Sequence, residues 1–333
     1  MKKVIVFGAT GSLGAYISIF LKEKGYMVYA VGRRKNVDSF FAKYGIPYIS
    51  LDISDNNSFK ALPTDIYAIL HFAGALPAGM KGYDASLYIS SIIQGTLNVL
   101  EYARLAKVDR IVYPQSLFDV SYLFGSKIPI PENSLRKAPL DGDHSTYVIA
   151  KNAAVDLIEH YYTAYGIKRF ILRLSRVYLY HPNPYTYTNG VKHMVSDRYL
   201  IYQALEGRDI ELWGDPDLLL ETICIKDFLQ IVEKALEVDT DGGLYNIGSG
   251  GSTLQERIEG IIHVFSPPSA NCRIIYKPEK RSSMQFTLDI SKTIAELGYR
   301  PRYKWIDYLY DFKREMEEQR FEELWGKENN YIL

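Results

Sequence analysis

The chain is poor in cysteine, with only Cys224 and Cys272 among its 333 residues. These two thiols stand far apart, and neither belongs to a CxxC pattern or has a histidine beside it. Disulfide scaffolds and structural zinc sites need more cysteines or closer spacing. We therefore expect no disulfide framework, no metal site and a reducing, cytoplasmic location.

An excess of charge is also absent, because 39 Lys and Arg balance 39 Asp and Glu. Proteins that bind nucleic acid usually carry a basic domain or stripe, so we expect no nucleic-acid partner. Long apolar runs are missing too, since no run approaches the roughly 18 residues of a membrane span or the core of a signal peptide. With 47% hydrophobic residues, the sequence predicts a globular protein of about two domains with no membrane contact.

Short apolar runs alternate with helical patterns over the first half of the chain. Helical periodicity separates runs at residues 2–7, 27–31, 48–51, 68–72, 110–113 and 169–172. Strands that alternate with helices in this way form a parallel sheet that is covered on both faces. This half therefore predicts a doubly wound α/β fold.

The alternation breaks down after Arg173. We expect a Tyr-rich loop over 178–187, followed by short strands and by helices at 191–206, 227–236, 254–265 and 308–325. This change predicts two units. Residues 1–175, to which 220–248 return, form a dinucleotide-binding domain, and 176–219 with 249–333 form a smaller C-terminal α/β lobe that binds the substrate.

A glycine-rich segment, Gly8-Ala-Thr-Gly11-Ser-Leu-Gly14, lies between the first expected strand and the first expected helix. Glycines at this spacing allow a tight turn, close approach of the backbone to a pyrophosphate, and close packing of helix on strand. The helix N-terminus adds N–H donors. In its strand-turn-helix context the motif predicts a dinucleotide site, against the alternative of an ordinary glycine turn.

The end of the second expected strand bears on which dinucleotide binds. An acidic residue there binds the adenosine ribose of NAD, whereas an arginine accommodates the 2′-phosphate of NADP. The segment Gly32-Arg33-Arg34-Lys35 has no carboxylate and offers guanidinium groups. This composition favours NADP(H) over NAD(H), against the alternative of a solvated basic loop.

Tyr147 and Lys151 are separated by about one turn of the helix expected over 147–165. A lysine near a phenol favours the ionised form, so we expect Lys151 to lower the pKa of Tyr147 and to let it exchange protons near neutral pH. Ser116 stands just after the strand expected at 111–113.

Together these features resemble the extended short-chain dehydrogenase/reductase family, in particular its NAD(P)-dependent nucleotide-sugar epimerase/dehydratase group. The resemblance runs from residue 2 to about 311 and includes Asp52, His71-Phe-Ala-Gly74, Gly95-Thr96-Leu-Asn98, Leu172-Arg173, Tyr245-Asn-Ile-Gly248, Asp289-Ile-Ser-Lys292 and Leu297-Gly298-Tyr299. It implies a Rossmann-like, doubly wound parallel sheet with a smaller C-terminal α/β substrate-binding lobe.

The resemblance also implies roles for individual residues. Tyr147 would be the general acid/base, Lys151 would hold the nicotinamide ribose, and Ser116 would bind the same substrate oxygen as Tyr147. Besides Tyr147 and Lys151, the cofactor-binding residues would be Gly8, Thr10, Gly11, Ser12, Leu13, Gly14, Arg33, Arg34, Asp52, Ile53, Phe72, Ala73 and Gly74.

The sequence departs from the family at several positions. Leu117 and Phe118 stand where 4,6-dehydratases have an Asp-Glu pair, so a 4,6-dehydratase is not expected. Ile92 replaces a usual Asn, and Leu220 replaces the Arg that binds the substrate diphosphate. Loss of that cation weakens diphosphate binding. The replacement charge could come from Arg176, which itself replaces an Asn, or from Lys192 or Arg281.

The leading hypothesis is therefore an NAD(P)-dependent 4-epimerase or 4-ketoreductase of a nucleotide sugar. A ketoreductase consumes NADPH, which fits Arg33, whereas an epimerase regenerates its cofactor in each cycle. Two alternatives stay open: a reductase or epimerase of a non-nucleotide substrate, and a non-catalytic regulator that binds NADP.

The family resemblance also implies a homodimer. Helices near 88–105 and 147–163 would pair with their copies across a two-fold axis. We expect the apolar contact face to come from Tyr88, Ile89, Ile92, Ile93 and Tyr161, against the alternative that these residues pack on the sheet of their own subunit.

Overall fold

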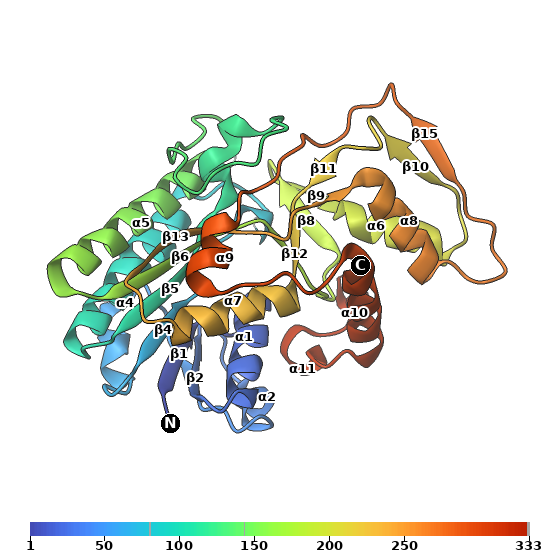
Figure 1. Cartoon of the computed structure of the whole chain (residues 1–333). Coiled ribbons are helices and arrows are strands. Elements are labelled where there is room, and N and C mark those ends of the chain that lie inside the picture. The colour runs from blue at the N-terminus through green and yellow to red at the C-terminus, as the bar shows by residue number, and fades with distance from the viewer. Residues whose placement is uncertain (80, 143, 332–333) are drawn as a thin grey trace.

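A computed structural model describes residues 1–79, 81–142 and 144–331 of the chain. Its centre is a sheet of seven parallel strands in the order β3-β2-β1-β4-β5-β6-β13 (Figure 1). The strands are β1 (Lys3–Phe7), β2 (Met27–Gly32), β3 (Tyr48–Ser50), β4 (Ala68–His71), β5 (Arg110–Ser116), β6 (Lys168–Leu174) and β13 (Gly242–Ile247). This order, which reverses between β1 and β4, is that of a Rossmann fold and confirms the predicted fold class.

Helices cover both faces of this sheet (Figure 1). One face carries α1 (Ser12–Glu23), α2 (Asp38–Ala42) and α7 (Ile225–Glu237), and the other carries α3 (Ala85–Tyr88), the π-helical segment Ile89–Gln94, α4 (Gly95–Leu105) and α5 (Ser145–Tyr165). The side chains of β1 alternate between two cores: Val4 and Val6 pack on the α1 side, and Ile5 and Phe7 on the α4 and α5 side. This two-sided burial explains why the four consecutive residues from Val4 to Phe7 are all apolar.

The parallel strands bring their carboxyl ends to one edge of the sheet. Gly8 follows β1, Arg33 follows β2, Asp52 lies just beyond β3, Phe72 follows β4, and Ser116 ends β5. Ligands of open α/β sheets bind along this edge, at the point where the strand order reverses. The topology therefore gathers residues that are far apart in the sequence.

The second half of the chain adds smaller pairs of strands and further helices. The parallel pairs are β7 (Arg176–Tyr178) with β12 (Thr222–Cys224) and β10 (Ile210–Trp213) with β15 (Ile274–Lys277), and β11 (Leu219–Leu220) pairs antiparallel with β14 (Ser252–Thr253). The helices are α6 (Ser196–Leu205), α8 (Leu254–Phe265), α9 (Ser291–Leu297), α10 (Trp305–Glu318) and α11 (Glu322–Trp325). The division of the chain at residue 175 stays a prediction.

A β-hairpin replaces part of the expected loop and helix near residue 190. Strands β8 (Tyr185–Thr188) and β9 (Val191–Met194) pair antiparallel, and α6 begins only at Ser196, so the prediction of a helix from residue 191 was wrong at its start. The turn residues Asn189 and Gly190 have φ angles of 50° and 74°. Asn-Gly is a strong signal for a two-residue hairpin turn, and it outweighed the helical pattern that follows.

The C-terminal segment returns to the sheet edge. Phe321 and Trp325 stack with 4.3 Å between ring centroids, and Phe321 lies 4.6 Å from the ring of Tyr16 on α1. Trp325 Nε1 donates a hydrogen bond of 3.1 Å to the carbonyl of Thr10 in the glycine turn. The end of the chain thus packs against the turn that follows β1.

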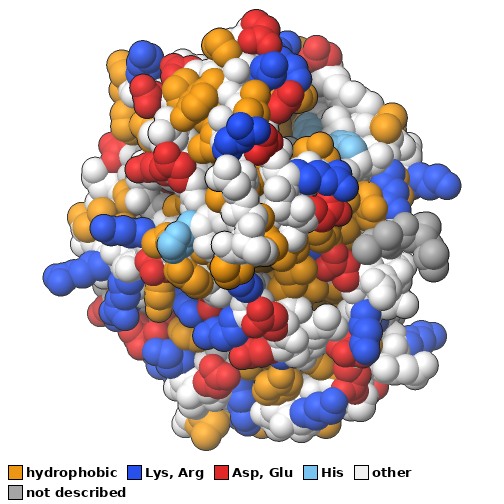
Figure 2. Space-filling model, turned by 90° about the vertical axis from the view of Figure 1, so that its right-hand side faces the viewer, with side chains coloured by type: hydrophobic (Ala, Val, Ile, Leu, Met, Phe, Trp, Pro, Cys, Tyr) orange, Lys and Arg blue, Asp and Glu red, His pale blue; other side chains and the backbone are white. Residues whose placement is uncertain are grey.

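The face of the molecule that lies on the right-hand side of Figure 1 carries intermixed charges. Figure 2 shows Lys and Arg side chains interspersed with Asp and Glu on this face. Within the described ranges, no helix combines the length and the apolar character that a membrane span requires.

Candidate functional site

The glycine turn between β1 and α1 is tightly closed. Gly8 has a φ of 83°, and the N–H groups of Gly8 and Ala9 both donate to the Val31 carbonyl at 2.9 and 3.0 Å. A Cβ at Gly8 would lie 2.6 Å from the backbone of Phe72, and a Cβ at Gly14 would lie 2.2 Å from the Gly8 carbonyl oxygen. No side chain fits at either position, so the backbone approaches both the neighbouring strand and any ligand closely.

A crevice of about 420 Å³ runs from this turn along the strand ends. Its lining includes ten of the predicted cofactor residues, namely Gly8, Thr10, Gly11, Arg33, Arg34, Asp52, Ile53, Phe72, Ala73 and Gly74. Four lining residues were not predicted: Val31, Gly32, Leu51 and Ser91. They could have been found from their places at the ends of β2 and β3 and beside the β4 loop. The cradle at Gly8 and the N-terminus of α1 fit a dinucleotide pyrophosphate.

The two arginines at the far end of the crevice have different partners. Arg34 Nη1 donates to the Leu324 carbonyl at 2.5 Å, which ties it to the C-terminal segment. The charge of Arg33 acts on Asp52: burial raises the pKa of this carboxyl, but hydrogen bonds from Ser54 and the nearby Arg33 outweigh burial and leave the pKa below its usual value. Among the described residues, Arg34 and not Arg33 forms a hydrogen bond to the C-terminal segment.

A second cavity, of about 460 Å³, shares Phe72, Ala73 and Gly74 with the crevice. Its lining brings together Ser116, Tyr147 and Lys151 with the remaining predicted cofactor residues, Ser12, Leu13 and Gly14. The strand end of β5 supplies Ser116, and the first two turns of α5 supply Tyr147 and Lys151. The geometry therefore joins the predicted acid/base residues to the glycine turn.

Burial governs the protonation of this pair. It raises the pKa of Tyr147 to about 12, although a hydrogen bond with Ser116 offsets part of the effect. Burial also lowers the pKa of Lys151 to about 7. The pKa of Tyr147 is therefore raised and not lowered as expected, because the loss of hydration of the buried phenol dominates. Lys151 Nζ lies 3.9 Å from the centroid of the Tyr113 ring.

A buried polar network fixes the backbone at Ser116. Gln115 Oε1 accepts from the Ser116 N–H at 3.0 Å, and Gln115 Nε2 donates to Asn152 and Asp119 at 2.7 and 3.1 Å. Asp119 in turn forms an ion pair with Arg173, and both side chains are fully buried. The Ser116 hydroxyl also accepts from the Phe118 N–H at 3.2 Å, so it caps the following helical turn while it faces the cavity.

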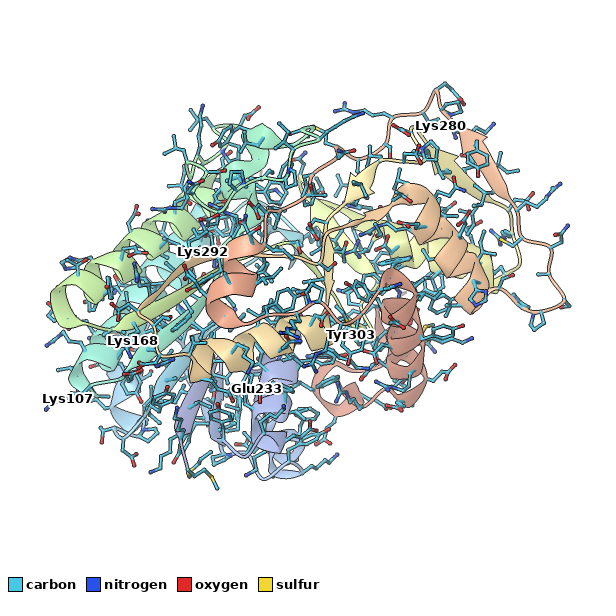
Figure 3. All side chains as sticks on the ribbon, in the orientation of Figure 1. Lys107, Lys168, Glu233, Lys280, Lys292 and Tyr303 are labelled. Carbon is cyan, nitrogen blue, oxygen red and sulfur yellow. The ribbon has the colours of Figure 1, made fainter. Side chains whose placement is uncertain are left out.

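The predicted substrate cations have different positions. Arg176 lines the second cavity and pairs with Asp197 at 2.7 Å. Lys192 lies on β9 and donates to the Tyr331 carbonyl at 3.2 Å, and it lines neither cavity. Arg281 is exposed and also lines neither cavity. The residue before it, Lys280, lies close to β10 and β15 (Figure 3).

The sequence did not predict most of the residues that line the second cavity outside the cofactor motifs, at its expected substrate end. Its unpredicted lining residues include Leu76, Pro77, Gln115, Phe124, His144, Leu174, Ser175 and Phe286. Leu117 and Phe118, which were singled out only for lacking acid/base chemistry, line it as well. These residues come from the ends of β5 and β6, from the turns that follow them and from distant loops, and no single motif in the sequence connects them.

The comparisons with known proteins agree with this architecture. The model of the NAD dependent epimerase/dehydratase family matches residues 4–248. A UDP-glucose 4-epimerase of Rhizobium meliloti is 24% identical over 90% of this chain and 92% of its own length. The structure of Thermotoga maritima UDP-glucose 4-epimerase with UDP-glucose has a TM-score of 0.75 at 18% identity, and covers 95% of this chain and 99% of that one. A Bacillus cereus UDP-glucuronic acid 4-epimerase variant, in complex with a UDP-sugar and NAD, has a TM-score of 0.72 at 22% identity and covers 95% and 99% of the two chains.

Proposed function

The chain belongs to the NAD-dependent epimerase/dehydratase family, and from this membership we propose that it transfers a hydride at a carbon of a nucleotide-linked sugar. The observation that carries the proposal is the shared lining of the two cavities. Ser116, Tyr147 and Lys151 stand in the cavity that adjoins the dinucleotide crevice through Phe72–Gly74. Relatives named for UDP-sugars support the nucleotide-linked substrate.

The glycine turn would hold the dinucleotide pyrophosphate against the N-terminus of α1. Arg33 would bind the 2′-phosphate of NADP, because a guanidinium can donate two parallel hydrogen bonds to a phosphate. NAD lacks this phosphate, so Arg33 would favour NADP. When bound, the nicotinamide supplies or accepts the hydride.

Tyr147 would control the proton that accompanies the hydride. Arrival of a hydride at a sugar ketone leaves an alkoxide, and the oxygen of this alkoxide must be protonated. With a pKa near 12, Tyr147 carries its proton at neutral pH and can donate it. Ser116 would donate a second hydrogen bond to the same oxygen, and Lys151 would orient the cofactor ribose and the phenol.

The test is the variant Tyr147→Phe, which keeps the ring and removes only the hydroxyl. We expect turnover to fall by at least about 10²-fold while dinucleotide affinity stays nearly unchanged, because general acid catalysis contributes about 10²–10⁴-fold. The control is Tyr165→Phe, at an exposed position of the same helix. Near-normal turnover in Tyr147→Phe on the true substrate would contradict hydride transfer assisted by Tyr147, whether or not that substrate carries a nucleotide.

A 4-epimerase and a 4-ketoreductase differ in their use of the cofactor. The epimerase returns its hydride to the same sugar, whereas the reductase consumes one NADPH per product. Leu117 and Phe118 cannot move a proton, which speaks against a 4,6-dehydratase. Absorbance of the reduced nicotinamide during product formation separates the two remaining reactions: a stoichiometric loss indicates a reductase, and no net loss indicates an epimerase.

A substrate without a nucleotide is the second candidate. It is favoured by Leu220 in place of the family arginine, and by the pairing of Arg176 with Asp197, which neutralises the cation at the substrate end. Thermal shift with UDP-, GDP-, CDP- and dTDP-sugars distinguishes the candidates. A sugar present at 100 times its dissociation constant adds about 2.7 kcal/mol to the free energy of unfolding.

We also propose a homodimer through the π-helical segment, α4 and α5. Ile89 and Ile149 are each 44% exposed on neighbouring elements of this face, and Ile93 is half-buried. Of the other residues expected in the contact, Tyr88, Ile92 and Tyr161 pack inside their own subunit. Light scattering at micromolar concentration should give twice the chain mass, and Ile149→Asp should give the monomer mass.

A further inference from the structure

The substrate end of the second cavity is bounded by three phenylalanines, Phe118, Phe124 and Phe286, which we call the aromatic wall. Phe124 and Phe286 stack with 4.7 Å between ring centroids and 18° between planes. Phe118 lies 6.2 Å from Phe124 and 39% of it is exposed. The wall thus presents apolar ring surface beside the residues that hold the reacting oxygen.

The aromatic wall is held in place by contacts behind it. Phe124 and Phe286 pack on a small buried cluster of Leu117, Val120, Ile130 and Leu288. The two distant segments are joined where the Gly125 N–H donates to the Gln285 carbonyl at 2.7 Å. The Phe118 N–H donates to the hydroxyl of Ser116. The wall therefore keeps a fixed position relative to Ser116 and does not depend on a ligand to form.

Charged side chains are scarce in this cavity. Among its described lining residues, the only Lys or Arg are Lys151 and Arg176, and no Asp or Glu contributes. Lys151 is buried over the Tyr113 ring, and Arg176 is paired with Asp197. A carboxylate placed against the rings of Phe124 and Phe286 would lose hydration without gaining a Lys or Arg partner, which is unfavourable. The one imidazole among the described lining residues, His144, lies beside Phe118, with 4.3 Å between ring centroids.

From this arrangement, and resting on the proposed function, we infer that the enzyme prefers sugars with a methyl group, rather than a hydroxymethyl or carboxylate group, next to the reacting carbon. The oxygen bound by Tyr147 and Ser116 fixes one ring carbon, so a substituent on the adjoining carbon lies close to these residues. Where that substituent meets the aromatic wall, a methyl group replaces water favourably, and a hydroxyl loses hydrogen bonds that the wall cannot return. The substrate class is a 6-deoxyhexose, oxidised or reduced at C4.

The test compares kcat/KM for three nucleotide sugars that share nucleotide and ring configuration and carry a methyl, hydroxymethyl or carboxylate group at C6. We expect the 6-deoxy sugar to be preferred over the hydroxymethyl sugar by about 10- to 10²-fold, the range that apolar pockets reach. The carboxylate should be the poorest of the three. Equal or better turnover of the hydroxymethyl or carboxylate sugar would overturn this inference and leave the proposed function intact.

Variants of the aromatic wall test the cause of the preference. Phe118→Asn should reduce it to within about threefold, whereas Phe118→Leu, which stays apolar, should largely keep it. The control Tyr276→Asn alters an exposed aromatic residue outside the cavity and should change nothing. A preference that persists in Phe118→Asn, and also in Phe286→Asn, would overturn the role of the wall. If none of the three sugars is bound or turned over with any of the UDP, GDP, CDP and dTDP nucleotides, the proposed function fails and the inference fails with it.

Discussion

The dinucleotide crevice and the substrate end of the second cavity are built in different ways. The crevice is formed largely by backbone and short loops at the ends of β1 to β4, in which each element follows directly from a strand. The substrate end combines side chains from the β5 loop, from Arg176 and from the distant Phe286. The shape of the crevice therefore follows from the order of the strands, whereas the shape of the substrate end depends on which side chains the chain carries at positions that the fold brings together.

The largest effect is expected from a substitution in the glycine turn of the dinucleotide crevice. In Gly14→Ala the new Cβ would lie 2.2 Å from the Gly8 carbonyl oxygen, so the turn must open. We expect at least about a 10²-fold loss of dinucleotide affinity, because misplaced donors at a helix N-terminus no longer meet the phosphates. The measurement is titration of NADP(H) by fluorescence or calorimetry.

Gly79→Ala is the control for this change, because nothing lies within 4 Å of the position of its Cβ and no positive φ is required there. Wild-type dinucleotide affinity in Gly14→Ala would show that the turn does not hold the pyrophosphate, and the contrast between the two regions would lose its basis.

The choice between NADP(H) and NAD(H) tests the role of one side chain in the crevice, that of Arg33. Arg33→Asp should reverse or erase a preference for NADP(H), with a change of about 10- to 10²-fold in the ratio of the two affinities, because a carboxylate repels the 2′-phosphate and accepts from the ribose. Arg34→Asp should change the ratio less, since Arg34 is tied to the Leu324 carbonyl. Equal affinity of the wild type for NAD(H) and NADP(H) would remove the argument.

These two predictions also mark how far the sequence could be interpreted. The strand pattern predicted the sheet because it depends on local rules, and the residues of the glycine motif line the crevice and the adjoining cavity. The wrong helix start at residue 191 came from overlooking the Asn189-Gly190 turn, a local signal that was available. Phe124 and Phe286 could not have been connected, because their stacking depends on the packing of two loops more than 150 residues apart.

Two further properties could not be predicted from the sequence, namely the position of Lys192 and the pKa shift of Tyr147. Lys192 was expected near the substrate, but the hairpin carries it toward Tyr331 instead. Tyr147 was identified from its spacing to Lys151, yet the direction of its pKa shift follows from burial, which spacing does not reveal. A motif in the sequence selects candidate residues, while the direction of a pKa shift depends on burial in the packed structure.

A pH effect on stability tests the burial of His71 in the central sheet. His71 ends β4, and burial lowers its pKa from 6.5 to about 3, helped by the charge of Lys151. Between these values the unfolded chain binds a proton that the native chain does not, so the free energy of unfolding falls as pH drops from 6.5 toward 3.

The contribution of one such group approaches about 1.4 kcal/mol per pH unit. In His71→Gln this part of the slope should disappear from denaturant unfolding curves measured between pH 6.5 and 4, whereas His160→Gln, at an exposed position, should leave it unchanged. An unaltered slope in His71→Gln would mean that His71 binds protons equally in both states.

The smallest expected effect concerns the contact between the C-terminal segment and the glycine turn. Trp325→Phe keeps an aromatic ring against Phe321 and removes the indole N–H that donates to the Thr10 carbonyl. A hydrogen bond of this kind contributes about 1 kcal/mol, and its loss leaves a carbonyl of the turn without that donor. We expect a similar loss in the free energy of unfolding and a weakening of NADP(H) affinity by a few fold, with kcat unchanged.

The control is Trp213→Phe, which removes an indole donor to Glu211 at an exposed site on β10 and should affect neither quantity by more than about 0.5 kcal/mol. If Trp325→Phe lowered stability but left dinucleotide affinity unchanged, the segment would stabilise the fold without positioning the turn, and the crevice would depend on the strand ends alone.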